Sequence, residues 1–352
     1  MLRSSVAVLA CLLALAAPAA ANTFPVTSNA DTVGTCTTSC TLRQAINSAN
    51  ADPAVDYIEL EPNLGTLTLT DALPSLGTAM VINGDNAGSD APHLRIDGSG
   101  LVNRGAGLNV TAPNVVVRGL SITGFDSYGV RIVADWATLD HLLIGKTPAG
   151  DDAAGVMGAG IFVLGNDTTI GNLDTTGGAT ATGNVIANTV ADPTTDPNGP
   201  PHRGDGIWVY SGSNNTIEGN VISGNAGAGV RLHAAATVDA NKIGTNFAGT
   251  AADGNNDWGV QVEPGATGAS VLGNVVSGNE VGGVLVQADD ASVTGNVVGL
   301  TADASAVLAN DGNGIEVSSD NVDVGNTTAP ANTIGGNTAA GVLITSTGTA
   351  YV

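Results

Sequence analysis

The sequence predicts an all-β solenoid in which short coils stack along one axis and form three parallel sheets. Three segments repeat one phrase: GNVISGNAGAGVRL at Gly219–Leu232, GNVVSGNEVGGVLV at Gly273–Val286 and ANTIGGNTAAGVLI at Ala331–Ile344. Such self-similarity indicates units that cannot bury an apolar face alone and therefore stack on their neighbours. The composition agrees, because 49 Gly, 3% aromatic and 12% charged residues suit short strands and frequent turns.

The first 21 residues predict a signal peptide. Arg3 precedes an apolar run from Val6 to Ala17, and three alanines at 19–21 form the small-residue end that such peptides carry. The mature protein is expected to begin near Asn22 and to be secreted, with an extracellular, periplasmic or cell-surface location. No second long apolar stretch follows, so we expect no transmembrane span.

The net charge excludes two classes of binding partner, and the cysteines indicate the cellular compartment. The formal net charge of −22, from 10 basic and 32 acidic residues, argues against nucleic acid and anionic membranes as partners. Cys36 and Cys40 stand four positions apart beside a turn, which predicts a local disulfide in an oxidising compartment. Two free thiols are the alternative.

Residues 22–106 are predicted to form an N-terminal cap and the first coils. Thr41 and Gln44 have the spacing of a capping box, which predicts a short helix over residues 41–50. Its apolar face is formed by Leu42, Ala45, Ile46 and Ala49. This helix can cover the open end of the first coil, which would otherwise expose core and strand edges.

Residues 107–352 are predicted to be β-helix repeats, aligned on one turn Asn per coil. The aligned residues are Asn184, Asn220, Asn241, Asn274, Asn296 and Asn332. Asn tolerates left-handed backbone at a tight turn, and stacked Asn side chains can hydrogen-bond one coil to the next. We therefore expect a left-handed turn at each Asn and an asparagine ladder along the solenoid.

Long coils differ from short coils by insertions at one corner. Ile243–Val262 maps onto Val298–Val317 with a constant shift of 55 positions, so the same insertion recurs at the same place. The insertions are Lys146–Ala159, Asn188–Asp205, Thr245–Trp258 and Leu300–Asn313. These loops are expected to project along one edge.

Each coil carries a G-h-x-h strand whose x residue points outward, because side chains alternate along a strand. The x residues form the predicted row Asn109, Arg131, Phe162, Trp208, Arg231, Gln261, Leu285, Glu316 and Leu343. Strand spacing places neighbours about 4.8 Å apart. The row borders the loop edge, and outward positions are expected to contribute little to the core.

These coils resemble the right-handed parallel β-helix of pectate-lyase type. Cys40–Ile46, CTLRQAI, is also similar to the C-S-L-R-E-A-I segment that precedes such helices in bacterial secreted and outer-surface proteins. Together the resemblances cover nearly all of the mature chain. They imply that polysaccharide lies along the sheet that carries the outward row. The N-T-D, D-D and G-H-G segments of polygalacturonase-like members are missing, apart from an isolated Asp151–Asp152 pair.

The candidate binding residues lie on this row or beside it: Arg131, Phe162, Trp208, Tyr210, Gln261, Glu263 and Glu316. Trp208 and Tyr210 suit stacking on sugar rings, and shielding by the loop 188–205 is the alternative interpretation. Arg131, Lys146, Arg203 and Arg231 fall on this face or its loops and predict a basic strip for an acidic sugar.

Candidate catalytic residues are Arg231, Asp205 and His233, with Arg231 as the base of lyase chemistry. Asp253 and Asp257 have the alternate spacing of a calcium loop, but Trp258 stands where the EF-hand Gly belongs. A looser calcium site in these loops is the alternative, and no other cofactor is indicated.

Two functions fit these observations. The first is a secreted or surface-exposed module, adhesin-like or scaffolding, that binds polysaccharide or a cell-surface partner. The alternative is a polysaccharide lyase, or less well a hydrolase, acting on an acidic polysaccharide. Because no cap is legible after Gly341–Ile344, end-to-end self-association or a longer parent chain is also expected.

Overall fold

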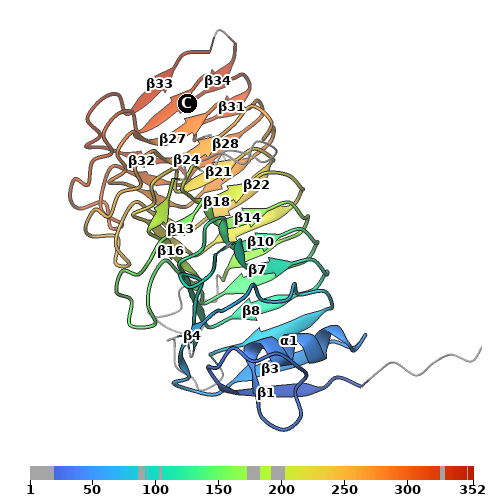
Figure 1. Cartoon of the computed structure of the whole chain (residues 1–352). Helices are drawn as coiled ribbons and strands as arrows, with labels where there is room; N and C mark the ends of the chain where they lie inside the picture. The colour runs from blue at the N-terminus through green and yellow to red at the C-terminus, as the bar shows by residue number, and fades with distance from the viewer. Residues whose placement is uncertain are drawn as a thin grey trace, which may run out of the picture.

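The computed structural model describes residues 20–85, 92, 94–102, 105–172, 183–191, 203–325, 330–346 and 348–352. The predicted signal peptide lies outside these residues except at its last two positions. Within the described residues the chain winds into a parallel β-helix with three long sheets and one helix (Figure 1). The predicted fold class is confirmed.

The three sheets follow one another around each coil. Sheet 1 contains β7 (Ala106–Val110), β10 (Tyr128–Ile132), β14 (Ala159–Val163), β18 (Asp205–Val209), β21 (Val230–Leu232), β24 (Trp258–Val262), β27 (Gly282–Val286), β30 (Ile315–Val317) and β33 (Val342–Ile344). Sheet 2 runs in the order β2 (Cys40–Thr41), β1 (Thr23–Ser28), β3 (Asp56–Leu60), β5 (Met80–Asn83), β8 (Val116–Arg118), β11 (Thr138–Asp140), β15 (Thr169–Gly171), β19 (Asn215–Glu218), β22 (Ala236–Asp239), β25 (Ser270–Leu272), β28 (Ser292–Thr294), β31 (Val322–Asp323) and β34 (Ala350–Tyr351). Sheet 3 contains β4 (Gly65–Thr68), β6 (Leu94–Asp97), β9 (Leu120–Thr123), β12 (Leu143–Ile144), β16 (Val185–Ala187), β20 (Val221–Ser223), β23 (Lys242–Ile243), β26 (Val275–Val276), β29 (Val297–Val298) and β32 (Thr333–Ile334).

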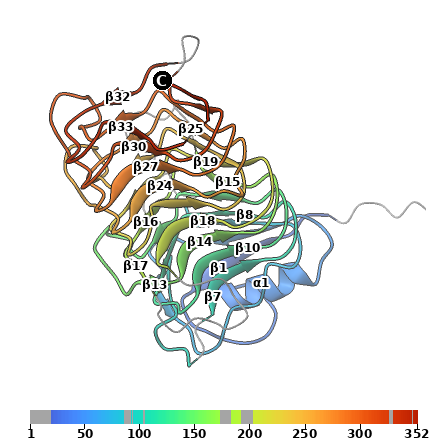
Figure 2. The same cartoon turned by 90° about the horizontal axis from the view of Figure 1, so that it is seen from above.

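The predicted insertions all connect a sheet 3 strand to the next sheet 1 strand, so they leave the coil at one corner, as expected. Residues 192–202 of the second insertion lie outside the described residues. Figures 1 and 2 show the loops gathered along this side of the coil. Two of the insertions also pair with each other through β13 (Val156–Met157) and β17 (Thr189–Val190).

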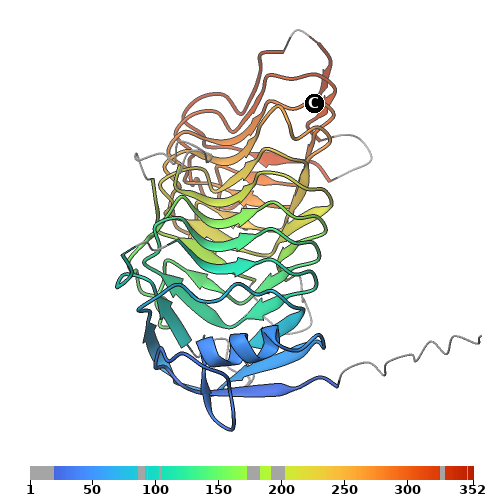
Figure 3. The ribbon, with the colours of Figure 1, turned by 45° about the vertical axis from the view of Figure 1, so that its right-hand side comes forward.

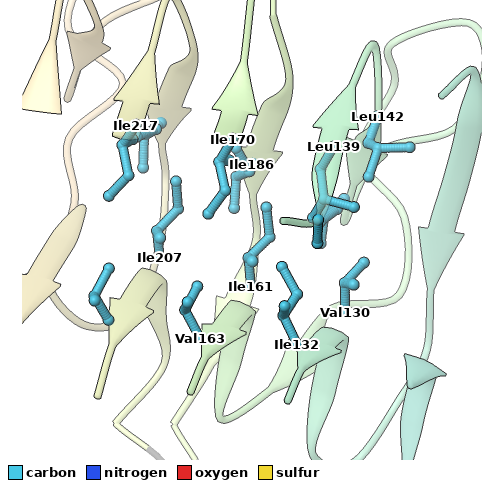
Figure 4. Close-up of a cluster of buried hydrophobic side chains, with 14 of the residues drawn as sticks. Val130, Ile132, Leu139, Leu142, Ile161, Val163, Ile170, Ile186, Ile207 and Ile217 are labelled. Atoms are coloured by element: carbon cyan, nitrogen blue, oxygen red, sulfur yellow. The ribbon is translucent and has the colours of Figure 1, made fainter. Parts of the chain in front are cut away.

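The core is a stack of aliphatic side chains inside the coil. Alternation sends every second residue of each strand inward, and parallel registers place equivalent residues in columns, such as Ile144, Ile186 and Ile222. Figure 4 shows Val130, Ile161 and Ile207 of sheet 1 facing Ile170 and Ile217 of sheet 2. These side chains are buried, and each contributes about 1.5–3 kcal/mol of transfer free energy.

The one helix among the described residues, α1 (Leu42–Asn50), covers the N-terminal end of the coil (Figures 1 and 3). The predicted capping box between Thr41 and Gln44 is present, and the predicted apolar face is buried. Arg43 fixes the helix by donating to Asp31 Oδ1 at 2.6 Å and to the backbone oxygen of Asp71 at 2.7 Å. The predicted Cys36–Cys40 disulfide is also formed.

The predicted asparagine ladder is confirmed between sheets 2 and 3. Each side-chain amide from Asn184 to Asn296 donates to the side-chain oxygen of the next Asn, at 2.9 or 3.0 Å. The expected left-handed backbone is wrong for these Asn residues: at four of the six positions the residue before the Asn adopts it, namely Gly219 (φ 66°), Ala240 (φ 52°), Gly273 (φ 62°) and Gly295 (φ 69°). The Asn side chain is thus free to turn into the coil.

A second ladder, which the sequence analysis missed, follows sheet 3. It joins Asn225, Asn255, Asn279, Asn310 and Asn337 by amide-to-oxygen hydrogen bonds of 2.9 Å. Each copy of the repeated phrase carries one Asn of each ladder, five residues apart, as at Asn220 and Asn225, and this spacing is the signal in the sequence that indicates the second ladder.

In the described residues no helix combines the length and the apolarity that a membrane crossing requires.

Candidate functional site

The predicted outward row exists and stays in register along sheet 1. Backbone pairing aligns Arg131 with Asn109 and Phe162, Trp208 with Phe162 and Arg231, and Gln261 with Arg231 and Leu285. Glu316 follows between Leu285 and Leu343. The G-h-x-h spacing therefore identified one continuous column of side chains.

The expectation that this column is exposed is wrong in its centre. Trp208 is 3% exposed and Arg231 is 1% exposed, and Phe162 is also buried. An outward direction from a strand does not ensure contact with water, because neighbouring side chains and the corner loops also lie over sheet 1. Trp208 Nε1 is buried with no hydrogen-bond partner among the described residues.

Arg231 is the centre of a buried polar cluster. Its Nε donates to Asp205 Oδ2 at 2.8 Å, its Nη2 to Asp257 Oδ2 at 3.1 Å and its Nη1 to Glu263 Oε1 at 3.1 Å. Nη1 also donates to the side-chain oxygen of Gln261. The guanidinium thus has four side-chain partners, which is the satisfied state that a buried charge requires.

The pKa values in this cluster argue against Arg231 as a base. Burial opposes its charge, but the carboxylates of Asp205 and Glu263 outweigh burial and raise the pKa of Arg231 above its ordinary value. Burial raises the pKa of Asp205, and the nearby guanidinium of Arg231 opposes that rise. A buried guanidinium held by carboxylates keeps its proton and cannot meet a ligand carboxylate without rearrangement.

Aromatic rings form a continuous stack across the coils of sheet 1. Tyr128 and Phe162 stack with centroids 4.4 Å apart, and Trp208 meets Phe162 edge to face at 5.2 Å. Trp208 also meets Tyr210 edge to face at 5.4 Å. The last contact is between Tyr210 and His233, whose rings are stacked at 5.1 Å and 16°. We call these five residues the ring ladder.

Only the Tyr210–His233 end of the ring ladder reaches solvent. Tyr210 is 36% exposed, and the His233 side chain is 50% exposed. His233 Nδ1 lies 2.9 Å from Glu263 Oε2, and the other carboxylate oxygen of Glu263 accepts from Arg231. The buried Arg231 cluster therefore fixes Glu263, and Glu263 orients the imidazole. We call Tyr210, His233 and Glu263 the ring platform.

The predicted basic strip is not formed. Arg131 donates to Asn109 Oδ1 at 3.1 Å, and Arg231 is enclosed by carboxylates. Lys146 lies on the sheet 3 side of the corner, where it pairs with Asp152 at 2.5 Å. Glu316 accepts from Asn313 Nδ2 at 2.8 Å.

The calcium candidates do not converge. Asp253 accepts from Ser223 Oγ at 2.7 Å, whereas Asp257 is bound to Arg231. Within the described ranges no group of three or more His, Cys, Asp or Glu side chains is arranged to hold a metal ion. The alternate spacing fails because each carboxylate has a separate partner on a different side of the loop.

Known proteins were compared with the chain by sequence and by structure. The family model described as "Right handed beta helix region" matches residues 152–352. No curated protein sequence matches the chain. The structure resembles pectate lyase Pel9A with a TM-score of 0.50 and 15% identity, covering 91% of this chain and 78% of that one.

Two further solved structures are similar at lower scores. The A-module of mannuronan C-5 epimerase AlgE6 from Azotobacter vinelandii has a TM-score of 0.45 and 14% identity, with coverage of 88% of this chain and 91% of that one. An alginate lyase from Paenibacillus sp. str. FPU-7 has a TM-score of 0.43 and 16% identity, with coverage of 94% and 97%. At these identities the likeness concerns the fold alone.

Proposed function

This chain belongs to the right-handed β-helix family, and from that premise we propose that it is a secreted or surface-exposed module that binds polysaccharide through the ring platform. Its role is adhesin-like or scaffolding. The observation that carries the proposal is the exposed, nearly parallel pair of rings formed by Tyr210 and His233 on sheet 1.

The ring platform has the chemistry that a sugar ring needs. Tyr210 and His233 each combine an apolar ring face with a polar edge, so the carbon-bound hydrogens of a pyranose can pack on them. Glu263 stands beside them as an acceptor for hydroxyl groups, and it is held by Arg231 and His233. A platform fixed before binding loses little side-chain entropy when the ligand arrives.

The charges at this surface favour a neutral polysaccharide. The platform itself contains the carboxylate of Glu263, and Asp257 shares the buried guanidinium of Arg231 with it. An acidic sugar would meet these carboxylates, and Arg231 is already bonded to both. This differs from the acidic ligand that the sequence suggested, because that ligand depended on an accessible Arg231.

The test is retention of a panel of neutral and acidic polysaccharides in affinity electrophoresis. Tyr210→Ala and His233→Ala should each weaken retention of the neutral ligand about tenfold, which corresponds to about 1.4 kcal/mol. Both side chains are partly exposed, so unfolding midpoints should hardly change. The matched control is Glu218→Ala on sheet 2. If this control weakens retention as much as Tyr210→Ala, the ring platform is not the binding surface.

A polysaccharide lyase or hydrolase is the second candidate, favoured by the contact between His233 and Glu263. A carboxylate that orients a half-exposed imidazole is an arrangement suited to general acid–base catalysis. Of the predicted catalytic residues Arg231, Asp205 and His233, only His233 has a side chain that solvent reaches. Unsaturated uronate products would identify a lyase, and new reducing ends without them a hydrolase. Either activity should disappear in His233→Gln.

A further inference from the structure

A groove lies on the outer face of sheet 3, around the corner from the ring platform. Its volume is about 290 Å³. Its floor is Leu143, Val185 and Val221, and its walls carry Lys146 and Phe247. We propose that this groove binds one uronic acid unit, that is, a pyranose ring that carries a carboxylate. The inference does not rest on the proposed function of sheet 1.

The groove exists because the corner hairpins are unevenly spaced. Three related hairpins close through antiparallel bridges between Lys146 and Asp152, Thr245 and Ala252, and Leu300 and Val307. The second and third hairpins touch, since Ala302 N donates to Gly249 O at 2.9 Å. The first hairpin follows β12 and the second follows β23, and the strands β16 and β20 lie between these two in sheet 3. Three strand spacings, about 14 Å, therefore separate the two hairpins. Within the described residues, Leu143 and Val185 are partly exposed in this gap, and Val221 beside them is 3% exposed.

The groove has apolar surfaces that fit a pyranose. Leu143, Val185 and Val221 form one outward column, because their strands pair in register. Phe247, on the second hairpin, is 47% exposed. A large aromatic ring held open beside an aliphatic floor is the usual lining of a small-molecule site. The volume lies just below the usual range of such sites, roughly 300–1,000 Å³, and suits a single ring.

Two lysines offer a positive charge to a ligand in this groove. They are the two lysines of the full sequence, which has 32 acidic residues: Lys146 lines the groove, and Lys242 adjoins it beside Val221 and Phe247. Lys242 continues the floor column after Val221, and its Nζ lies 5.5 Å from the centroid of the Phe247 ring. No ion pair of Lys242 is found in the part of the chain that the structure describes. Lys146, by contrast, is paired with Asp152.

Polar groups at the end of the groove suit hydroxyl groups. Asp253 and Ser223 line it and are hydrogen-bonded at 2.7 Å, and Asn246 adds an amide. A carboxylate acceptor fits a ligand with hydroxyl donors and disfavours a dianion such as a phosphate monoester. A uronate has a group for each of these features. Its ring packs on the apolar floor, its hydroxyls donate to Asp253, and its carboxylate pairs with Lys242.

The test uses the two lysines as reporters. Protein labelled with ¹⁵N only at lysine gives one backbone resonance for each of Lys146 and Lys242, and both can be followed by NMR. The probes are the methyl glycosides of galacturonic, glucuronic and mannuronic acid, each beside its neutral hexoside. At least one uronide should shift both resonances, and its neutral counterpart should bind about tenfold more weakly. If no uronide shifts them, or the neutral sugar binds equally well, the proposal is overturned.

Variants test separately how the charge of Lys242, the ring of Phe247 and the free volume of the groove contribute to uronide binding. Lys242→Met keeps the apolar stem and should reduce uronide affinity to that of the neutral hexoside, as followed at Lys146, while Lys242→Arg should retain it. Phe247→Ala should weaken binding, and Val185→Phe should abolish it by filling the groove while leaving both lysines in place. The control for the loss of an exposed ring is Tyr57→Ala, which lies on sheet 2.

Two outcomes distinguish this site from the ring platform. Tyr210→Ala should leave the uronide shifts unchanged, and Val185→Phe should leave retention of neutral polysaccharide unchanged. Loss of the uronide shifts in Tyr210→Ala, or undiminished shifts in Val185→Phe, would show that the uronide binds elsewhere.

Discussion

Arg231 shows that the direction in which a side chain leaves its strand does not determine whether it contacts water. Its place in the G-h-x-h strand makes it an outward side chain, which register confirms. Yet three carboxylates from three other positions enclose it, and it has almost no contact with water. It is therefore better described as a structural residue that holds Glu263 for the ring platform than as a residue that meets a ligand.

The first prediction concerns removal of this charge. Arg231→Met should lower the free energy of unfolding by about 3–5 kcal/mol, because Asp205 is left as a buried carboxylate without its cation. Arg131→Met, at a partly exposed position of the same row, should cost under about 1 kcal/mol. Urea unfolding measures both. The double variant Asp205→Leu/Arg231→Met should recover most of the loss, and a double variant less stable than Arg231→Met would contradict this account.

The second prediction concerns acid titration of Asp303 in the third corner hairpin. Hydrogen bonds from the Thr301 and Ser305 hydroxyls lower the pKa of Asp303 from 3.8 to about 2. Because the folded pKa lies below the unfolded value, any stability from this group is complete above about pH 3.8 and is lost as the pH falls through about 2. NMR titration of the carboxyl should give this midpoint. Thr301→Val should raise it, and an unchanged midpoint would rule out the hydroxyl as its main cause.

At the scale of elements, the coils are joined by asparagine side chains as well as by strands. The two ladders lie at the two ends of the sheet 3 strands, where the chain turns and backbone groups lose their sheet partners. Asn255 illustrates the role: its amide donates to Ile222 O at 3.1 Å and to Asn279 Oδ1 at 2.9 Å. Its own oxygen accepts from Asn225.

The third prediction compares two neighbouring asparagines. Asn255→Ala should lower the free energy of unfolding by about 1–3 kcal/mol, because the Asn225 backbone N–H then lacks its buried acceptor and the Asn225 side-chain amide loses one of its two acceptors. Asn256→Ala, one position later and exposed, should change it by less than about 0.5 kcal/mol. Thermal and urea unfolding provide the measurement. Equal losses in the two variants would mean that the ladder adds nothing beyond local turn structure.

At the scale of the whole molecule, stability should vary along the solenoid axis. In a stack of coils each unit is stabilised mainly by its two neighbours. The middle strands β24 and β27 pair on both sides, whereas β33 and β34 pair on one side and their core residues are partly exposed. The N-terminal end differs, because α1 covers it.

The fourth prediction follows from this gradient. Amide hydrogen exchange followed by mass spectrometry should be slowest in β24 and β27 and clearly faster in β33 and β34, since terminal coils open without global unfolding. The first coils beneath α1 should be protected almost as well as the middle. Uniform protection from β24 to β34 would show that the described coil opens only as one cooperative unit.

The sequence by itself determined the coil. The recurrent phrase identified the strands and their register, the Asn spacing identified the first ladder, and Thr41 with Gln44 identified the capping helix. These features depend on local rules: strand alternation, turn chemistry and capping hydrogen bonds act within a few residues, so they can be recognised in the sequence. The corner occupied by the insertions followed from the constant shifts between coils.

Only the tertiary structure decided which of these side chains meet water and which meet each other. Alternation gives the direction in which Trp208 and Arg231 leave their strand, but their burial depends on residues in other coils. The same holds for the groove, because Lys146 on the first hairpin, Phe247 on the second and the floor residues between them line one space only after the coils have stacked. Burial, charge pairing and cavities are set by contacts between residues far apart in the chain, and local patterns carry no information about such contacts.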